Sequence, residues 1–343
     1  MNDSFDSRSN LVSRQHMQPL SDLSAGRQVG RFTLLEFLGE GGMGSVWTAE
    51  DPTRKDETRD GRIVLKFLRD DIRRCPQAVQ QFSSSYRKVQ QLHHEHICPM
   101  LDLGEDPLFG SFQVMHLVAG VPLDRLIIMQ DPDRTGLPVE TVLNWLTPVA
   151  KALDYAHRHG IVHRDIKPGN IIVDPVTGEV HVVDFGLAAE VRTSMSRHSR
   201  SVLEFSGTEP YMAPEQWQGQ PQDGRSDQYS LAVVAWELLT GDLPYQGSGM
   251  QLGFAITNGS IPELPDQLAA LQPVFTMAMA KDRKQRFGNA TAFLKALSNP
   301  STAVSANSSL GAIDVSRKAL AAVPSPSDDL AALLQQTQES VAR

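Results

Sequence analysis

Short strand-like segments occupy the first part of the chain, and longer helical periods follow after Val118. The strand-like segments are RFTLLEFLG, SVWTAE, RIVLKFL and SFQVMHLV, separated by glycine-rich or charged turns. This arrangement is typical of an antiparallel sheet with hairpin connections. In the second part, apolar residues recur at intervals of three and four, which indicates amphipathic helices near 139–159, 225–240, 265–280 and 289–297. Strands first and helices afterwards predict an α+β chain with two lobes of different class.

The composition indicates a globular protein from a reducing compartment. Of the 343 residues, 41% are hydrophobic, which is enough for one large core or two modest ones. The net charge of −8 argues against a nucleic acid partner, because phosphate backbones are held mainly by excess Lys and Arg. The two cysteines, Cys75 and Cys98, form no disulfide framework. Without a signal peptide or an apolar run of roughly 20 residues, we expect a soluble cytoplasmic protein that does not enter a membrane.

Both ends of the chain lack hydrophobic periodicity. Residues 1 to about 28 are rich in Ser, Asn, Asp and Gln, which predicts disorder. From Asn299 onward Ser, Ala, Asn and Pro dominate, as in a linker, and only SPSDDLAALLQQ near the end favours a short helix. We therefore divide the chain into a disordered segment, a small lobe, a large lobe and a flexible tail, with the bounds 1–29, 30–117, 118–299 and 300–343.

A glycine-rich turn and a lysine in a strand suggest phosphate binding. In LGEGGMGSVW, residues Gly39, Gly41 and Gly44 have the spacing G-x-G-x-x-G, which lets backbone N–H groups approach phosphate oxygens. Dinucleotide-binding folds share this spacing, but a helix follows there, whereas a strand follows here. Lys66 lies in the apolar run IVLKFL. Alone it would be a solvent-facing lysine on an edge strand, but the upstream glycine turn favours a role with the α- and β-phosphates.

The segment IVHRDIKPGNIIV concentrates charge without obvious structural need, and HVVDFGLA follows it. Asn170 in the first segment and Asp184 in the second offer the oxygen ligands that Mg²⁺ prefers, with Mn²⁺ as an alternative. Asp165 can accept a proton from an incoming hydroxyl group. Lys167 can neutralise charge on a phosphoryl group in transfer. Together the two segments predict a phosphoryl-transfer site.

With these motifs, the chain resembles the protein kinase family, which combines a glycine loop, a strand lysine, an H-R-D loop and a D-F-G motif. The segment GTEPYMAPE (207–215) resembles the substrate-facing loop of that family. Asp227 matches the helix aspartate that supports the catalytic loop, and Arg286 matches the arginine that pairs with Glu215. The resemblance covers roughly residues 31–298. GGMGSVW and HRDIKPGN are most similar to the bacterial serine/threonine, Hanks-type, branch.

The resemblance implies a bilobal kinase fold. Its small lobe holds an antiparallel β-sheet and one large helix, and its larger lobe is mainly α-helical. It also implies transfer of the γ-phosphoryl group of ATP to Ser or Thr of a protein substrate, a specificity that Lys167 and Thr208 match. Asp165, Lys167 and Lys66 would be catalytic, and self-association could allow autophosphorylation. The implied nucleotide-binding residues are Leu38, Gly39, Glu40, Gly41, Gly42, Met43, Gly44, Val46, Val64, Lys66, Met115, His116, Val118 and Ile172.

One catalytic partner of the family is missing. Active kinases pair the strand lysine with a glutamate on the large helix of the small lobe, whereas Ser85 occupies that position here. No acidic residue occurs between Asp71 and Glu95. A neutral hydroxyl holds an ammonium less firmly than a carboxylate does, so Lys66 could swing towards Asp184. This departure leaves open a pseudokinase scaffold that binds nucleotide with weak or no transfer. A small-molecule kinase is disfavoured by the complete GTEPYMAPE segment.

Arg164, next to Asp165, indicates regulation by phosphate. Kinases of this kind often pair this arginine with a phosphate on the activation loop. The candidates lie in AEVRTSMSRHSRSVLEFSGT, and we expect autophosphorylation within 193–201; the alternative is a polar loop without a regulatory role. The cluster HHEHIC lacks a second group of ligands at zinc spacing, which disfavours a metal site.

Overall fold

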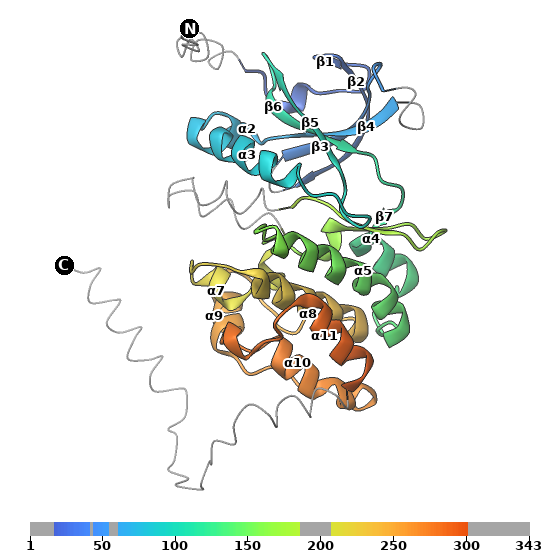
Figure 1. Cartoon of the computed structure of the whole chain (residues 1–343), viewed down its shortest axis with the longest axis vertical. Coiled ribbons are helices and arrows are strands. Elements are labelled where there is room, and N and C mark those ends of the chain that lie inside the picture. Colours follow the sequence, from blue (N-terminus) through green and yellow to red (C-terminus); the bar gives the residue numbers. More distant parts are fainter. Residues whose placement is uncertain (1–16, 42–43, 55–60, 186–206, 301–343) are drawn as a thin grey trace, which may run out of the picture. The chain divides into compact units, whose positions relative to one another are not determined.

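The computed structural model describes residues 17–41, 44–54, 61–185 and 207–300 (Figure 1). They belong to the first of two units into which the chain divides, residues 1–304. The second unit, residues 305–343, lies outside the described residues, as do the short helix expected near its end and the expected autophosphorylation sites in 193–201. In the part that is described, no helix is both long and apolar enough to cross a membrane.

The small lobe contains a six-stranded antiparallel sheet with the strand order β1-β2-β3-β4-β6-β5. Because side chains alternate along a strand, one face carries Leu65 of β4 and Val114 of β6 into the core of this lobe. The other face carries Val64 and Met115 into a separate apolar cluster. The strands are β1 (Gln28–Val29), β2 (Phe32–Gly41), β3 (Gly44–Glu50), β4 (Arg62–Phe67), β5 (Met100–Asp106) and β6 (Gly110–His116).

Helix α3 (Pro76–Val89) lies beside this sheet and follows the single-turn helix α2 (Asp70–Arg73) (Figure 1). Pro76 occupies the first helical position. An N–H at this position makes no hydrogen bond within the helix, so the absence of one in proline costs nothing there. The helix buries Phe82 and Tyr86 in a cluster against which Leu103 of β5 packs. Its apolar face thus holds the helix on the sheet, as the kinase resemblance implies.

Residues 17–29 belong to the small lobe, which corrects the predicted disorder of this part of the chain. They include the 3-10 turn η2 (Leu20–Asp22) and strand β1. Leu23 and Val29 are buried in the small-lobe core. The fully buried Arg73 donates hydrogen bonds to the main-chain oxygens of Gln18 and Leu108. Two isolated apolar residues produce no periodicity, but they still complete a core. Residues 1–16 lie outside the described residues.

The large lobe is mainly helical, with a small antiparallel sheet of order β7-β8-β9. Helix α8 is buried on nearly all sides, as expected for the central helix of a bundle. Asp223 caps it by accepting from the N–H of Arg225, and Gly241 ends it in the left-handed conformation (φ 78°). The elements are β7 (Val121–Pro122), α4 (Leu123–Gln130), α5 (Val139–Arg158), η4 (Pro168–Asn170), β8 (Ile171–Val173), β9 (Val180–Val182), η6 (Glu209–Tyr211), α7 (Pro214–Trp217), α8 (Gly224–Thr240), α9 (Gly249–Asn258), η7 (Asp266–Leu271), α10 (Gln272–Ala278), η8 (Arg283–Gln285) and α11 (Ala290–Ser298).

Helices α5, α8 and α11 confirm three of the four predicted helical segments. The fourth prediction, one helix near 265–280, is wrong in detail. The segment is a 3-10 helix, η7, followed by the α-helix α10. Pro273 lies in the first turn of α10 and cannot donate to the carbonyl of Ala269, so a continuous α-helix would lose that hydrogen bond.

Candidate active site

The glycine-rich segment is a β-hairpin between β2 and β3, with Gly39 opposite Val46 and Gly41 opposite Gly44. A strand follows the glycines, which agrees with the sequence prediction and excludes the dinucleotide pattern at this turn. Gly44 has φ 142°, and a Cβ placed there would lie 1.9 Å from the carbonyl oxygen of Phe67. Only glycine fits this approach. Of the predicted residues in the turn, Gly42 and Met43 lie outside the described residues.

An apolar cluster under the sheet contains several of the predicted nucleotide-binding residues. Val64 and Met115 face each other across β4 and β6, and Val46 and Val118 pack against them. Cys98 and Val183 belong to the same cluster, although neither was predicted to bind nucleotide. Burial and the nearby Asp184 raise the pKa of the Cys98 thiol to about 12, which favours the protonated thiol.

The other predicted nucleotide-binding residues lie on the elements around this cluster. Leu38, in β2, is partly exposed, and Glu40 follows Gly39 in the same strand. His116 ends β6, and its carbonyl oxygen lies 3.4 Å from the sulfur of Cys98. Ile172, in β8, pairs with Pro122 and His181 of the neighbouring strands.

Asp165 lies at the centre of a hydrogen-bonded group. The Nδ2 atom of Asn170 donates to the main-chain oxygen of Asp165 (2.7 Å) and to its Oδ2 (3.0 Å). The Nζ atom of Lys167 lies 3.7 Å from the same Oδ2 and donates to Oγ1 of Thr208 (2.8 Å). The other carboxylate oxygen, Oδ1, is buried and has no hydrogen-bond partner within the described ranges. One oxygen of Asp165 is therefore positioned by the protein, and the other is buried without a hydrogen bond from the described residues.

Asp227 of α8 holds the loop that carries Asp165. Its carboxylate accepts from the main-chain N–H groups of His163 (2.8 Å) and Arg164 (2.7 Å) and lies 2.7 Å from Nε2 of His157. Arg164 has φ 65°, an uncommon conformation for a side chain of this size. Burial would raise the pKa of Asp227, but the hydrogen bond and charge of His157 outweigh it and lower the pKa. An ionised carboxylate thus stabilises the strained turn before Asp165.

His157 should make the stability of the protein depend on pH. Burial lowers its pKa, but the hydrogen bond and charge of Asp227 outweigh burial and raise the pKa above the ordinary value. The stabilisation by protonated His157 is therefore fully present below the unfolded pKa and is lost as the pH rises through the folded pKa. We expect His157→Gln to reduce the free energy of unfolding more at pH 6 than at pH 9, as measured by urea denaturation. Equal losses at both pH values, or the same trend in His159→Gln, would contradict this.

Asp184 lies beside the Asp165 loop because the two segments are hydrogen-bonded. Val183 donates its N–H to the main-chain oxygen of Asn170 (3.0 Å), and the main-chain oxygen of Val183 lies 2.9 Å from Nε2 of His163. The ring of Phe185 packs on the ring of His163, with centroids 4.5 Å apart. These contacts bring Asn170 and Asp184, the predicted metal ligands, to the same part of the large lobe.

Lys66 forms an ion pair with Asp184, with 2.6 Å between Nζ and Oδ2. Burial would raise the pKa of Asp184, but the charge and hydrogen bond of Lys66 outweigh it and lower the pKa. The ion pair agrees with the expectation that Lys66 could turn towards Asp184. It also joins a residue of the small lobe to the D-F-G segment of the large lobe.

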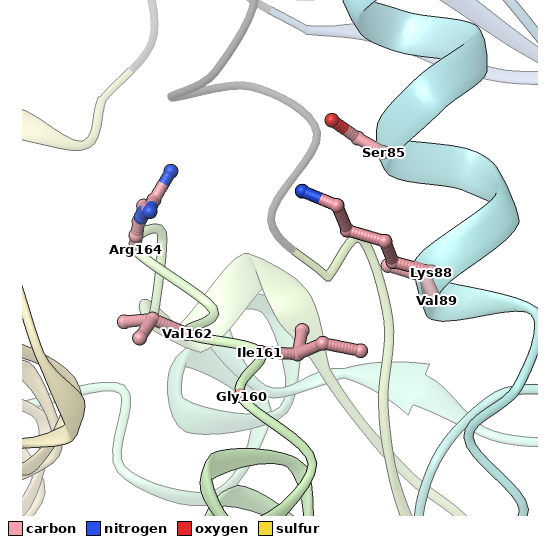
Figure 2. Close-up of a pocket in the computed structure, with 7 residues that line it drawn as sticks. All are labelled: Ser85, Lys88, Val89, Gly160, Ile161, Val162 and Arg164. Carbon is pink, nitrogen blue, oxygen red and sulfur yellow. The ribbon is translucent and has the colours of Figure 1, made fainter.

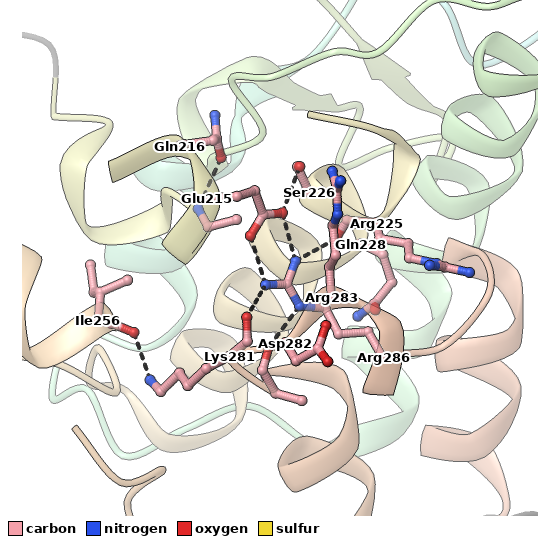
Figure 3. A network of polar contacts seen from close by, with 12 residues as sticks. Glu215, Gln216, Arg225, Ser226, Gln228, Ile256, Lys281, Asp282, Arg283 and Arg286 are labelled. Atoms are coloured by element: carbon pink, nitrogen blue, oxygen red, sulfur yellow. Dashed lines mark hydrogen bonds and ion pairs between the residues drawn. The ribbon is translucent and has the colours of Figure 1, made fainter. Parts of the chain in front are cut away.

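Figure 3 shows the polar network behind the substrate-facing segment. Both Nη atoms of Arg286 donate to the carboxylate of Glu215 at 2.8 Å, and Ser226 donates to the same carboxylate at 2.7 Å. Arg286 also donates to the main-chain oxygens of Ala280 and Arg225. The arginine side chain is 0% exposed and that of Glu215 is 4% exposed. The predicted pairing of these two residues is confirmed.

Comparisons with known proteins agree with this geometry. A family model described as a protein kinase domain matches residues 32–298. The chain belongs to the protein kinase family. Serine/threonine-protein kinase Pkn1 of Myxococcus xanthus is 34% identical over 284 residues, which cover 80% of this chain and 39% of that protein. PknA of Mycobacterium tuberculosis is 33% identical over 276 residues, which cover 78% of this chain and 61% of that protein.

A solved kinase structure also matches. The crystal structure of the Mycobacterium tuberculosis PknI kinase domain has a TM-score of 0.64 and 29% identity, covering 80% of this chain and 98% of that one. The match, with the antiparallel sheet and the helical large lobe, confirms the predicted α+β kinase fold. The chain spans less than two thirds of the length of the curated relatives named above.

The main departure from the kinase family lies on α3. Ser85, which the family resemblance aligns with the helix glutamate, is buried and lines a pocket with Lys88 and Arg164. In Figure 2, Ser85 and Lys88 project from α3 into the space that Arg164 borders from the other side. The remaining lining residues are Val89, Gly160, Ile161 and Val162. Two cationic side chains, Lys88 and Arg164, therefore face this pocket beside Ser85.

Two supporting contacts were not foreseen from the sequence. His157 contacts Asp227 although the two lie in different helices, α5 and α8. Gln216, directly after the A-P-E segment, donates its side-chain amide to the main-chain oxygen of Arg164 (2.9 Å). Each is an ordinary polar residue in a helix, and only the packing of distant segments gives it a role.

Proposed function

We propose that the chain is an ATP-dependent serine/threonine protein kinase. The main support is the hydrogen bonding of the Asp165 carboxylate. One of its oxygens accepts from Asn170, and the other is buried without a hydrogen-bond partner among the described residues. A hydroxyl group of a protein substrate fits that second oxygen as a hydrogen-bond donor. The names of the kinase relatives support the same activity.

The reaction transfers the γ-phosphoryl group of ATP to a serine or threonine hydroxyl. Asp165 orients the hydroxyl and accepts its proton as the new P–O bond forms and the bond to ADP breaks. Lys167, held between Asp165 and Thr208, places a positive charge beside the oxygen that attacks. The contact with Thr208 supports serine/threonine specificity, as the family resemblance implies. Most of the rate enhancement then comes from positioning and charge.

Asn170 and Asp184 have the chemistry to hold Mg²⁺, with Mn²⁺ as an alternative. The amide nitrogen of Asn170 is used by Asp165, which leaves its amide oxygen for a cation. The carboxylate of Asp184 pairs with Lys66, whose charge and hydrogen bond outweigh burial and lower the pKa of Asp184. Hard oxygen ligands of this kind suit Mg²⁺. The bound metal would neutralise charge on the triphosphate, and Lys66 and the glycine hairpin would hold its other phosphates.

The proposal is tested by incubating the full chain with γ-labelled ATP, Mg²⁺ and a generic basic protein. Label on serine or threonine of that protein is expected, and it should disappear with EDTA and return with excess Mg²⁺. Nucleotide binding without any transfer above an Asp165→Asn blank would refute the kinase proposal and indicate a nucleotide-binding scaffold. Label on small molecules alone would equally overturn it.

We further propose a cytoplasmic location, self-association during autophosphorylation, and regulation by phosphate within residues 193–201.

The charges of Arg164 and Lys88 support the regulation by phosphate, because both side chains line one pocket and their positive charges suit a phosphate group. After incubation with MgATP, mass spectrometry should find phosphate in 193–201. Lys88→Ala should weaken the activation that follows, whereas Lys151→Ala on an exposed part of α5 should not. Absence of phosphate from the segment would refute the proposal.

A further inference from the structure

Gln113 lies in one row with Lys66 across the small-lobe sheet. The antiparallel register places Val46 opposite Lys66, Lys66 opposite Gln113, and Gln113 opposite Leu103. Side chains opposite each other in antiparallel strands share a face, with Cβ atoms about 4.5–5.5 Å apart. Gln113 therefore faces the same side as the ammonium group of Lys66. Its neighbour Val114 faces the other side and lies in the small-lobe core.

The side-chain amide group of Gln113 is buried without a hydrogen bond from the described residues. The residue is 0% exposed, and neither Oε1 nor Nε2 has a hydrogen-bond partner in the described part of the chain. Buried polar side chains nearly always have a partner, and an exception requires an explanation. Leu103, on the other side of Gln113, packs against the cluster that α3 forms with the sheet. The amide thus lies between Lys66 and the sheet edge that α3 covers.

Lys66 gives up its ion pair with a side chain if Asp184 is to hold a metal ion. Its only ion pair among the described residues is with Asp184, at 2.6 Å. Ser85 supplies no carboxylate from α3. When Asp184 turns to a cation, Lys66 would reach the phosphates with no anionic side chain of the described residues holding it from the protein side. An amide oxygen directly across the strand pair can accept from the ammonium, and this bond would also satisfy the buried amide.

We propose that Gln113 is a positioning residue whose amide oxygen accepts a hydrogen bond from Lys66 in the magnesium–nucleotide complex, in place of the missing helix carboxylate. The inference rests on the proposed function, since it needs Lys66 on the phosphates and Asp184 on the metal. It explains how a kinase domain without the helix glutamate keeps its strand lysine in place. It also couples nucleotide binding to the hydrogen bonding of Gln113.

The test uses Gln113→Leu in the full chain. Leucine is close in size and leaves no unsatisfied amide, so the variant should unfold at the same temperature as the unchanged protein or a higher one. Its equilibrium affinity for MgATP should fall about tenfold, the size expected for one hydrogen bond to a charged group. Its KM for ATP should rise more than kcat falls. Ser111→Ala, on the same strand but opposite Glu105, should match the unchanged protein.

Two further variants separate positioning from a general packing role. In a Lys66→Met background, Gln113→Leu should have no additional effect, because the bond would already be lost. Ser85→Glu should restore the affinity of Gln113→Leu by supplying a carboxylate from α3. An unchanged affinity in Gln113→Leu, or full additivity with Lys66→Met, would overturn the inference. If affinities change as expected but no protein transfers phosphate, the inference stands and the proposed kinase activity fails.

Discussion

Asp165→Asn is expected to lower the rate of phosphoryl transfer by roughly 10²–10⁴-fold, the usual contribution of a general base. The amide keeps the shape of the carboxylate and its bonds to neighbouring groups. It cannot accept the proton of the substrate hydroxyl at the buried Oδ1 position. Because the proposed contact of Asp165 is with the acceptor hydroxyl and not with the nucleotide, the affinity for MgATP should change little. Steady-state transfer of labelled phosphate, with affinity measured by calorimetry, gives both quantities.

The matched control is Asp133→Asn, which makes the same chemical change at an exposed position between α4 and α5. It should leave the transfer rate within about twofold of the original, as surface substitutions usually do. Asp165→Asn should also unfold at nearly the same temperature as the unchanged protein, so that lost activity is not lost structure. A variant that keeps more than a tenth of the rate would remove Asp165 from its proposed role as base.

The parts of the site that could be predicted from the sequence are those in which neighbouring residues form a recognisable motif or match the kinase family. The glycine spacing between two strand-like runs predicted a hairpin, and β2 and β3 form one. Glu215 and Arg286 are far apart in sequence, and their pairing was expected only from the family resemblance. Their burial makes that pairing necessary, since an isolated buried charge is strongly unfavourable.

The contacts that the sequence could not reveal depend on which distant residues share a face or a core. Residues 17–29 have no periodicity, yet Leu23 and Val29 fill the small-lobe core. Gln113 is an ordinary polar residue in a strand until the register places it opposite Lys66. The ion pair of Lys66 with Asp184 could be anticipated because the absence of a glutamate is visible in the sequence. The position of Gln113 opposite Lys66 across β4 and β6 cannot be seen in the sequence.

Arg286→Met is expected to reduce the free energy of unfolding by about 3–5 kcal/mol, the range for breaking a buried ion pair from one side. Methionine fills part of the space of the arginine but leaves Glu215 as a buried charge that has lost its cationic partner and keeps the hydrogen bond from Ser226. Burial would raise the pKa of Glu215, and Arg286 now holds that pKa below its ordinary value. Removing the arginine should therefore also change the pH dependence of stability. Going from neutral to mildly acidic pH should favour the folded state more in Arg286→Met than in the parent protein. Urea denaturation at two pH values measures both effects.

Two comparisons decide whether the lost stability comes from the uncompensated carboxylate. Adding Glu215→Gln to Arg286→Met should recover part of the loss, because a neutral amide at this site can keep a hydrogen bond to Ser226 at a lower desolvation cost. Arg69→Ala removes an arginine from a surface pair with Asp71 and should cost no more than about 1 kcal/mol. A loss in Arg286→Met as small as that of Arg69→Ala would show that the pair behaves as a surface pair despite its burial. The network behind the substrate-facing segment would then be held by packing around α8 and not by charge.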